Sequence, residues 1–109
     1  MKVSYTAKWK PEVYVTLDNA SRESIREICS YIVEEAQSIV SVRSGYLHDN
    51  IRIDKLSAKE GMVVADTDYA MFVEYGTSKM AAQPFMRPIA NRTIEIENLS
   101  QEVMNRHLR

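Results

Sequence analysis

Apolar and polar residues alternate at the beginning of the chain. Over residues 2–10 the apolar side chains, Tyr5 and Trp9 among them, occupy every second position, a period typical of a half-buried strand. Pro11 interrupts the pattern, because proline has no N–H to donate to a sheet. The alternation resumes over residues 12–17, which indicates either a second short strand or an extended arm that a partner orders.

In the next segment of the chain, the apolar residues recur with a period of three to four. Between residues 25 and 40 the apolar side chains recur at this spacing, and charged side chains fill the other faces. The pattern predicts an amphipathic helix. Residues 18–21 offer several N-caps, whose side-chain oxygens can accept from free backbone N–H groups. We expect residues 41–45 to end the helix, with Gly45 free to adopt a positive φ.

The middle of the chain returns to strand-like patterns. Residues 50–56 alternate, residues 57–61 are turn-forming, and residues 62–66 begin with a β-prone apolar run. Two such runs joined by a short turn predict an antiparallel hairpin.

The sequence pattern of the last third of the chain predicts helices. A short helix is expected over residues 69–75, capped by Asp66 or Asp68 and ended by Gly76. A second long helix is expected from about Pro88, because proline suits the first helical turn. The predicted fold is α+β, with two long helices packed on a small antiparallel sheet and a short helix and loop between the hairpin and the last helix.

Composition narrows the class of protein. The 109 residues suffice for one domain, and 45% hydrophobic with 27% charged residues is close to the average for folded proteins. The net charge of -1 argues against a general binder of nucleic acid or of anionic membranes. No apolar run is long enough to span a bilayer, the first residues lack the apolar core of a signal peptide, and Cys29 has no second cysteine. These features favour a cytosolic, reduced setting.

The inventory of reactive side chains is small. Cys29 falls in the apolar stripe of the first helix, which predicts a packed thiol. His48 and Asp49 have no second histidine-rich motif to complete a metal site, and the chain has no glycine-rich phosphate loop. We therefore expect no enzymatic activity, cofactor or metal. An enzyme that uses Glu74 and His48 is a minor alternative.

The loop over residues 76–83 is a better candidate for function. It lies between a glycine that ends one helix and a proline that precedes the next, and loops held at both ends are common binding devices. A simple connector is the alternative. Trp9 suggests an interface, although burial in the core would also explain it. The predicted contact residues are Tyr5, Trp9, Thr77, Ser78, Lys79 and Met80.

Several short motifs occur in a fixed order along the chain. They are Ser44-Gly45-Tyr46-Leu47, Asn50-Ile51, Tyr69-Ala70, Phe72-Val73-Glu74-Tyr75-Gly76-Thr77 and Pro84-Phe85-Met86-Arg87-Pro88. In this order the chain resembles the head–tail joining, or tail-completion, proteins of long-tailed bacteriophages and prophages. It departs from them at Val42-Arg43, where members often have Pro-Val, and at Asn50, where they have serine. Residues 1–17 do not align with the family pattern.

The resemblance implies a structural, non-enzymatic component of the virion. Such subunits form a ring, usually a hexamer, at the neck between the head connector and the tail tube, with DNA only as passing cargo and no membrane partner. The protein would be in the host cytoplasm during assembly. A small monomeric or dimeric protein-binding module, with its partner at the 76–83 loop, is the alternative.

The motif residues are assigned mainly to the fold. Aromatic and proline side chains there would anchor the two ends of the loop. A salt bridge between Arg87 and Glu74 would join the two halves of the motif. The motif residues are Gly45, Leu47, Tyr69, Phe72, Glu74, Gly76, Pro84, Phe85, Arg87 and Pro88.

Overall fold

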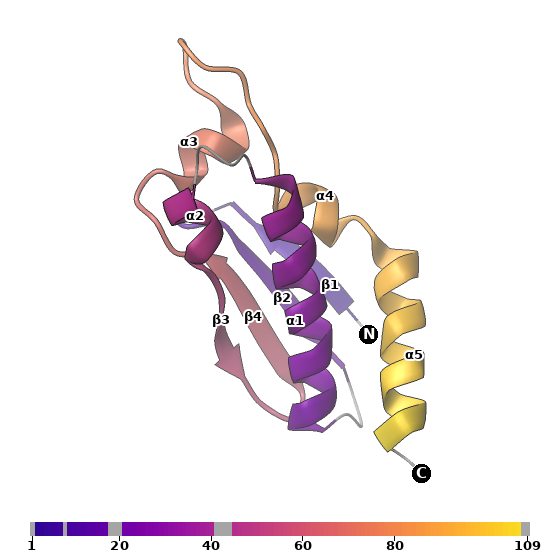
Figure 1. Cartoon of the computed structure of the whole chain (residues 1–109). Coiled ribbons are helices and arrows are strands. Elements are labelled where there is room, and N and C mark those ends of the chain that lie inside the picture. The colour runs from indigo at the N-terminus through magenta and orange to yellow at the C-terminus, as the bar shows by residue number, and fades with distance from the viewer. Residues whose placement is uncertain (1, 8, 18–20, 41–44, 108–109) are drawn as a thin grey trace.

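A four-stranded antiparallel sheet with helices on one face forms the body of the protein (Figure 1). The computed structural model describes residues 2–7, 9–17, 21–40 and 45–107. The strands are β1 (Lys2–Thr6), β2 (Glu12–Thr16), β3 (Ile51–Leu56) and β4 (Glu60–Ala65). Their order in the sheet is β1-β2-β4-β3, so β1 and β3 are the edges. The α+β class predicted from the sequence is confirmed.

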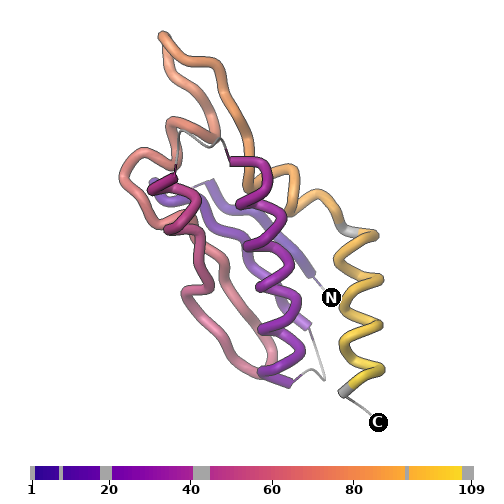
Figure 2. Tube along the Cα trace, in the orientation of Figure 1, coloured from indigo at the N-terminus to yellow at the C-terminus, as the bar shows by residue number. Residues whose placement is uncertain are grey.

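The helices are α1 (Arg22–Ile39), α2 (Gly45–Asp49), α3 (Ala70–Tyr75), α4 (Arg87–Ala90) and α5 (Thr93–His107). Helix α1 crosses the sheet and α5 runs beside it, while α2 and α3 gather at one end (Figure 1). The chain trace in Figure 2 shows the segment between α3 and α4 projecting beyond that end. The molecule is correspondingly long, with principal extents of 51 × 22 × 22 Å. No helix in the described ranges is both long and apolar enough to cross a membrane.

The core lies between α1 and the sheet. The buried stripe of α1 follows the predicted spacing and packs against alternate residues of the two central strands, because successive strand side chains point to opposite faces. Leu47, Phe85 and Met86 complete the core from the far end of the molecule. The fully buried apolar residues of the stripe and of the two central strands are Ile25, Ile28, Cys29, Ile32, Ala36, Val13, Val15, Val63 and Ala65.

The two N-terminal strands, the first helix and the hairpin are confirmed. Helix α1 begins after Ser21, whose Oγ accepts from the Ser24 N–H at 3.1 Å; the other candidate caps, residues 18–20, lie outside the described residues. The hairpin turn is shorter than predicted and spans residues 57–59. A register shift between Ile53 and Lys55 places Lys55 opposite Met62, whereas simple alternation would have kept it on the side of Ile53.

Two predicted helix boundaries are wrong. Gly45 is the first residue of α2 and has no positive φ, and α1 has already ended at Ile39. Helix α3 is capped by Tyr69, without a side-chain hydrogen bond. The Asp66 carboxylate lies too early to cap it and instead pairs with Lys10 and Arg52.

The predicted second long helix is divided in two. Arg87 and Pro88 occupy the first turn of α4, as expected for proline. Helix α4 then ends at Ala90, with Asn91 as its C-cap, a residue type that favours caps over helix interiors. The Arg92 guanidinium lies 2.6 Å from the Glu35 carboxylate of α1. The break lets α4 contact β1 while α5 packs against α1.

Gly61 of β4 supplies a test of the packing between α1 and the sheet. A Cβ atom at this position would lie 2.5 Å from Cys29 Sγ and 2.8 Å from Ile25 Cγ2. We predict that Gly61→Ala lowers the free energy of unfolding by about 1–3 kcal/mol through overpacking, measured by urea denaturation. Gly45→Ala is the matched control, because nothing lies within 4 Å of its Cβ. Equal stability of the two variants would contradict the packing described.

Candidate interaction surface

A buried carboxylate joins α3 to α4. The Glu74 side chain is fully buried. Its oxygens accept hydrogen bonds from the backbone N–H groups of Phe85, Met86 and Arg87 at 2.9, 3.2 and 2.8 Å. These amides lead into α4, where N–H groups lack helical partners and the helix dipole favours negative charge. Glu74 therefore caps a helix that follows it by more than ten residues.

Arg87 completes this connection. Its Nε lies 3.3 Å from Glu74 Oε1, and its Nη2 donates to the Glu74 carbonyl at 2.9 Å. The guanidinium carbon also lies 4.2 Å from the centre of the Tyr75 ring, a cation–π contact. The predicted Arg87–Glu74 pair is confirmed, and the backbone hydrogen bonds add to it. We refer to this group of contacts as the Glu74 clamp.

The clamp holds both ends of the projecting loop, residues 76–83, which we call the finger. Gly76 has φ +77°, and a Cβ there would lie 2.6 Å from the Ala82 nitrogen, so glycine is required. Thr77 and Met80 exchange backbone hydrogen bonds at 2.8 and 3.3 Å, and Gln83 N–H donates to the Val73 carbonyl at 2.8 Å. The finger is thus an ordered, hydrogen-bonded turn at the end of the molecule.

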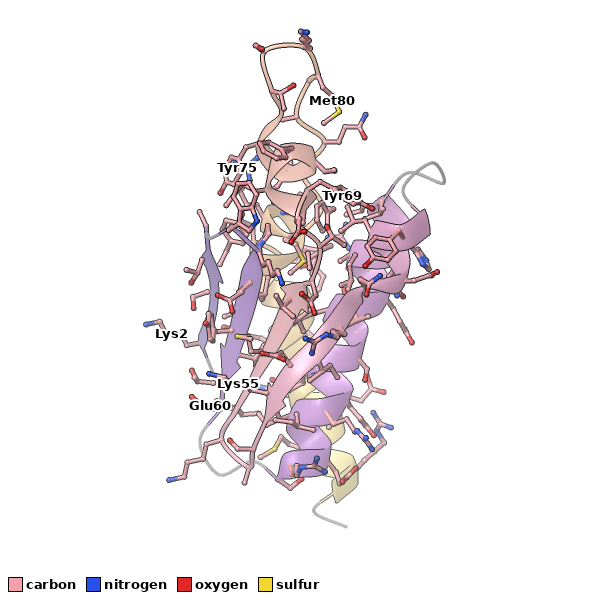
Figure 3. All side chains as sticks on the ribbon, turned by 90° about the vertical axis from the view of Figure 1, so that its left-hand side faces the viewer. Lys2, Lys55, Glu60, Tyr69, Tyr75 and Met80 are labelled. Carbon is pink, nitrogen blue, oxygen red and sulfur yellow. The ribbon has the colours of Figure 1, made fainter. Side chains whose placement is uncertain are left out.

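Aromatic side chains surround the base of the finger. Tyr69, Phe72 and Tyr75 follow one another at three-residue spacing along α3 and its cap, and each pairs with a ring from another segment. The pairs are Tyr69 with Tyr46 (6.4 Å between centroids), Phe72 with Trp9 (5.3 Å, edge to face) and Tyr75 with Tyr5 (6.5 Å). Figure 3 shows Tyr69 and Tyr75 below the finger that carries Met80.

This aromatic end, formed by those six side chains, is largely open to solvent. The exposed fraction is 56% for Trp9, 66% for Tyr46 and 42% for Phe72. Tyr5 is half-buried, and burial, the neighbouring Tyr75 and the negative charge of Glu74 raise its pKa above the ordinary value. Contiguous exposed apolar surface of this kind marks interaction sites in folded proteins.

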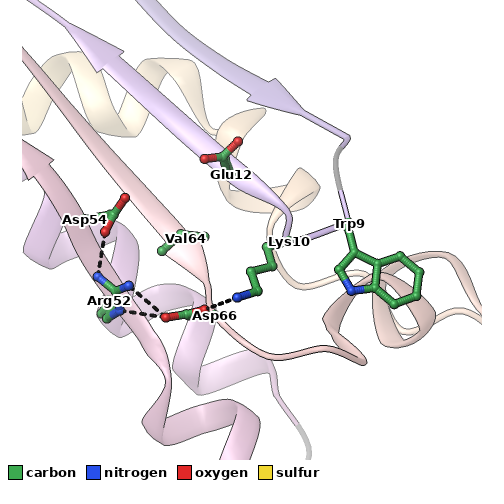
Figure 4. Close-up of a pocket in the computed structure, with 7 residues that line it drawn as sticks. All are labelled: Trp9, Lys10, Glu12, Arg52, Asp54, Val64 and Asp66. Carbon is green, nitrogen blue, oxygen red and sulfur yellow. Dashed lines mark hydrogen bonds and ion pairs between the residues drawn. The ribbon is translucent and has the colours of Figure 1, made fainter.

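Besides the aromatic end, the surface has a hollow on the face of the sheet opposite the helices (Figure 4). It has a volume of about 420 Å³. Lys10 Nζ lies 2.8 Å from one Asp66 oxygen, and Arg52 reaches the other Asp66 oxygen at 2.7 Å and Asp54 at 2.8 Å. Hydrogen bonds from Lys10, and then from Arg52, hold the pKa of Asp66 below its ordinary value. Val64 forms an apolar part of the lining, and Trp9 and Glu12 also line it.

The structure places most predicted contact residues at this end. Trp9, Thr77, Ser78, Lys79 and Met80 are exposed, and Trp9 lies beside the base of the finger rather than in the core. Tyr5 belongs to β1 and is half-buried, packed against the core cluster.

The residues assigned to the fold differ in how far they are buried. Leu47, Glu74 and Phe85 are buried, whereas Pro84, just before α4, and Arg87 and Pro88, in its first turn, are half-buried. Tyr69 and Phe72 were expected to serve the fold, yet they are 36% and 42% exposed. The reason is that α3 is a single short helix at the end of the sheet. Each of its rings packs against one ring from another segment, and the rest of the ring faces solvent.

Sequence reasoning missed the hollow and the aromatic pairs. The three-residue spacing of Tyr69, Phe72 and Tyr75 was an available signal for an aromatic helix face. The hollow had no local signal, because Lys10, Arg52 and Asp66 come from distant segments. Among the described residues, no three histidine, cysteine, aspartate or glutamate side chains group as metal ligands.

Comparisons with protein-family models, with curated proteins and with solved structures found no match to this chain.

The clamp yields a stability prediction. Glu74→Gln removes the buried charge and turns an amide N–H₂ toward backbone donors, so we expect the free energy of unfolding to fall by about 3 kcal/mol, measured by urea denaturation. Glu35→Gln, at a partly exposed ion pair with Arg92, should cost less than about 1 kcal/mol. A Glu74 variant no less stable than the Glu35 variant would refute the capping role.

The hollow yields a pH prediction. Because the folded pKa of Asp66 lies below the ordinary 3.8, its ion pairs stabilise the protein above that pH and are lost as pH falls through the folded pKa. Asp66→Asn should reduce stability by about 1 kcal/mol at neutral pH, and the difference from the wild type should shrink below about pH 4. Glu102→Gln on α5 is the control, and a pH-independent difference for Asp66→Asn would contradict the assignment.

Proposed function

We propose that this protein is a tail-completion subunit of a long-tailed phage or prophage, which assembles into a ring at the neck between the head connector and the tail tube. The observation that carries the proposal is that the motifs of the resemblance build an exposed surface. Tyr69, Phe72, Gly76 and Thr77 lie at the aromatic end and in the finger, and a fold alone gives no reason to expose such rings.

The distribution of surfaces supports assembly by unlike contacts. The aromatic end and the finger lie at one tip, the hollow lies on the open sheet face and shares Trp9 with the aromatic end, and β1 and β3 are the edge strands of the sheet that the structure describes. A contact between two different surfaces of identical subunits, repeated around an axis, closes a ring. An open strand edge is also a template for pairing with another chain.

The same aromatic end would serve a monomeric or dimeric binding module. The two functions differ in the mass of the purified protein. A ring subunit forms a discrete closed oligomer, for which six subunits is the expectation from the resemblance, whereas a module remains a monomer or dimer.

The direct test is deletion of the gene from the phage or prophage genome that carries it. We expect the induced lysate to contain filled heads and separate tails by electron microscopy, and joined particles to return when the purified protein is added. Normal virions from the deletion strain would refute a function at the neck.

Assembly in solution gives a quantitative prediction. We expect light scattering on a size-exclusion column to show a closed oligomer for the wild-type protein. In Phe72→Ser the concentration at which the oligomer dissociates should rise at least about tenfold, because exposed aromatic anchors dominate many interfaces. Ile94→Ser is the matched control, because Ile94 is 72% exposed on α5, away from the aromatic end. Equal effects of the two substitutions would exclude the aromatic end as the contact surface.

A further inference from the structure

We propose that β1 of one subunit pairs with β3 of a second copy of this chain, antiparallel and in one register, so that the sheet continues from subunit to subunit. This inference rests on the proposed function, because it specifies the unlike contact that would close the ring.

Both edge strands have one side without a neighbouring strand. β1 and β3 lie at opposite sides of the sheet (Figure 1), where β1 pairs with β2 alone and β3 pairs with β4 alone. Outside the strand ladders, no backbone–backbone hydrogen bond among the described residues involves residues 2–6 or 51–56. An edge of this kind is a template for a further strand.

The directions of the strands fit this contact. Each of the three neighbouring pairs in the sheet is antiparallel, so β1 and β3 run in opposite directions. A second copy placed beside the first, with its helices on the same face, therefore brings its β3 antiparallel to β1. Because the contact joins two different edges, it is head-to-tail and can be repeated around an axis until a ring closes.

One register preserves the hydrogen-bond pattern of the sheet. Tyr5 is opposite Val13, and Val13 is opposite Val63. Val63 is in turn opposite Ile53, so the four residues form one row across the sheet. In an antiparallel sheet the N–H and C=O groups of one residue point to the same neighbour, so hydrogen-bonded and non-hydrogen-bonded pairs alternate along a row. After these three pairs, a fourth pair between Ile53 and Tyr5 of the next copy continues the alternation.

The same register matches the faces of the two strands. It places Tyr5 opposite Ile53 of the second copy and Val3 opposite Leu56. All four side chains are only partly buried against the core within one subunit, so the pairing would remove further apolar surface from water. A slip by one residue would set the core-facing side chains of one strand against the open-face side chains of the other, so the apolar pattern specifies the register.

The charges and the bulge of β3 make the pairing selective. Arg52 and Lys55 on this strand, and the register shift between Ile53 and Lys55, are features that keep an edge strand from pairing indiscriminately. In the proposed register the two cations lie opposite the small, uncharged side chains of Thr6 and Ser4. β1 therefore fits an edge that would repel a strand with cations at these positions.

The pairing is continuous with the aromatic end. Tyr5 lies in β1, whereas Tyr46 lies in α2, which leads into β3. The proposed register brings the Tyr46 side of one aromatic end next to the Tyr5 and Trp9 side of the next copy. The strand edges and the exposed rings would thus belong to one contact between subunits.

Cysteine cross-linking tests the pairing directly. Ser4 and Lys55 lie in one row with Tyr14 and Met62, so the register places Ser4→Cys opposite Lys55→Cys of the next copy, close enough for a disulfide. Within one chain three strand spacings, about 14 Å, separate the two positions. The native Cys29 is fully buried, and burial raises its pKa to about 12, so it does not react. On oxidation, or with a short bismaleimide in parallel, we expect the double variant to give a ladder of covalent multimers that ends at the size of the oligomer.

Ser4→Cys combined with Glu102→Cys on α5 is the control and should give no ladder. An oligomer that forms without a ladder in the first variant would overturn the strand pairing while leaving the ring itself in place. Covalent dimers from Ser4→Cys alone would show that β1 pairs with itself around Ser4, its central residue, and would also overturn the inference. A chain that stays monomeric at every concentration would overturn it too, whereas the deletion experiment tests the neck function independently.

A charge swap provides an independent readout. Ser4→Lys would place two cations opposite each other across the contact, so the dissociation concentration of the oligomer should rise at least about threefold. Adding Lys55→Glu gives the pair opposite charges and should restore the wild-type value. Asn98→Lys, at an exposed position on α5, is the control and should leave that value unchanged. An effect of Ser4→Lys that Lys55→Glu does not reverse would exclude the proposed register.

Discussion

The buried Glu74 carboxylate is the interaction on which the finger and the aromatic end depend. This side chain near the end of α3 accepts hydrogen bonds from three backbone N–H groups at the start of α4, and it also forms an ion pair with Arg87. A buried charge is stable only when its hydrogen-bonding capacity is filled. The carboxylate therefore requires α3 and α4 to stay together, and the finger between them is held at both ends by one residue.

This arrangement separates the core from the contact surface. The core consists of α1 against one face of the sheet, with Phe85 and Met86 drawn into it by the same clamp. The aromatic rings of α3 then lie outside the core, where they pair with rings from β1, from α2 and from the connection before β2. Rigid rings on a fixed scaffold lose little entropy on binding, which would favour the contact between subunits that we propose.

Much of the fold could be predicted from the sequence because its signals are local. The alternation before Pro11, the apolar stripe of α1 and the two runs of the hairpin each reflect a face that must be buried. The predictions that failed concern contacts between distant segments. Asp66 or Asp68 was expected to cap α3, yet its N-cap is Tyr69 and Asp66 binds Lys10 and Arg52. The expected long last helix breaks at Asn91, and the next residue, Arg92, pairs with Glu35 of α1.

The α+β class and the positions of the strands and of α1 follow from the pattern of apolar and polar residues along the chain, and the opposite charges of Arg87 and Glu74 suggested their pairing. The capping of α4 by Glu74, the exposure of Tyr69 and Phe72, and the hollow that Lys10, Arg52 and Asp66 share depend on how distant segments meet in three dimensions. Periodicity reports which side of an element is buried, whereas a hydrogen bond or ion pair between distant segments exists only after the sheet has aligned them.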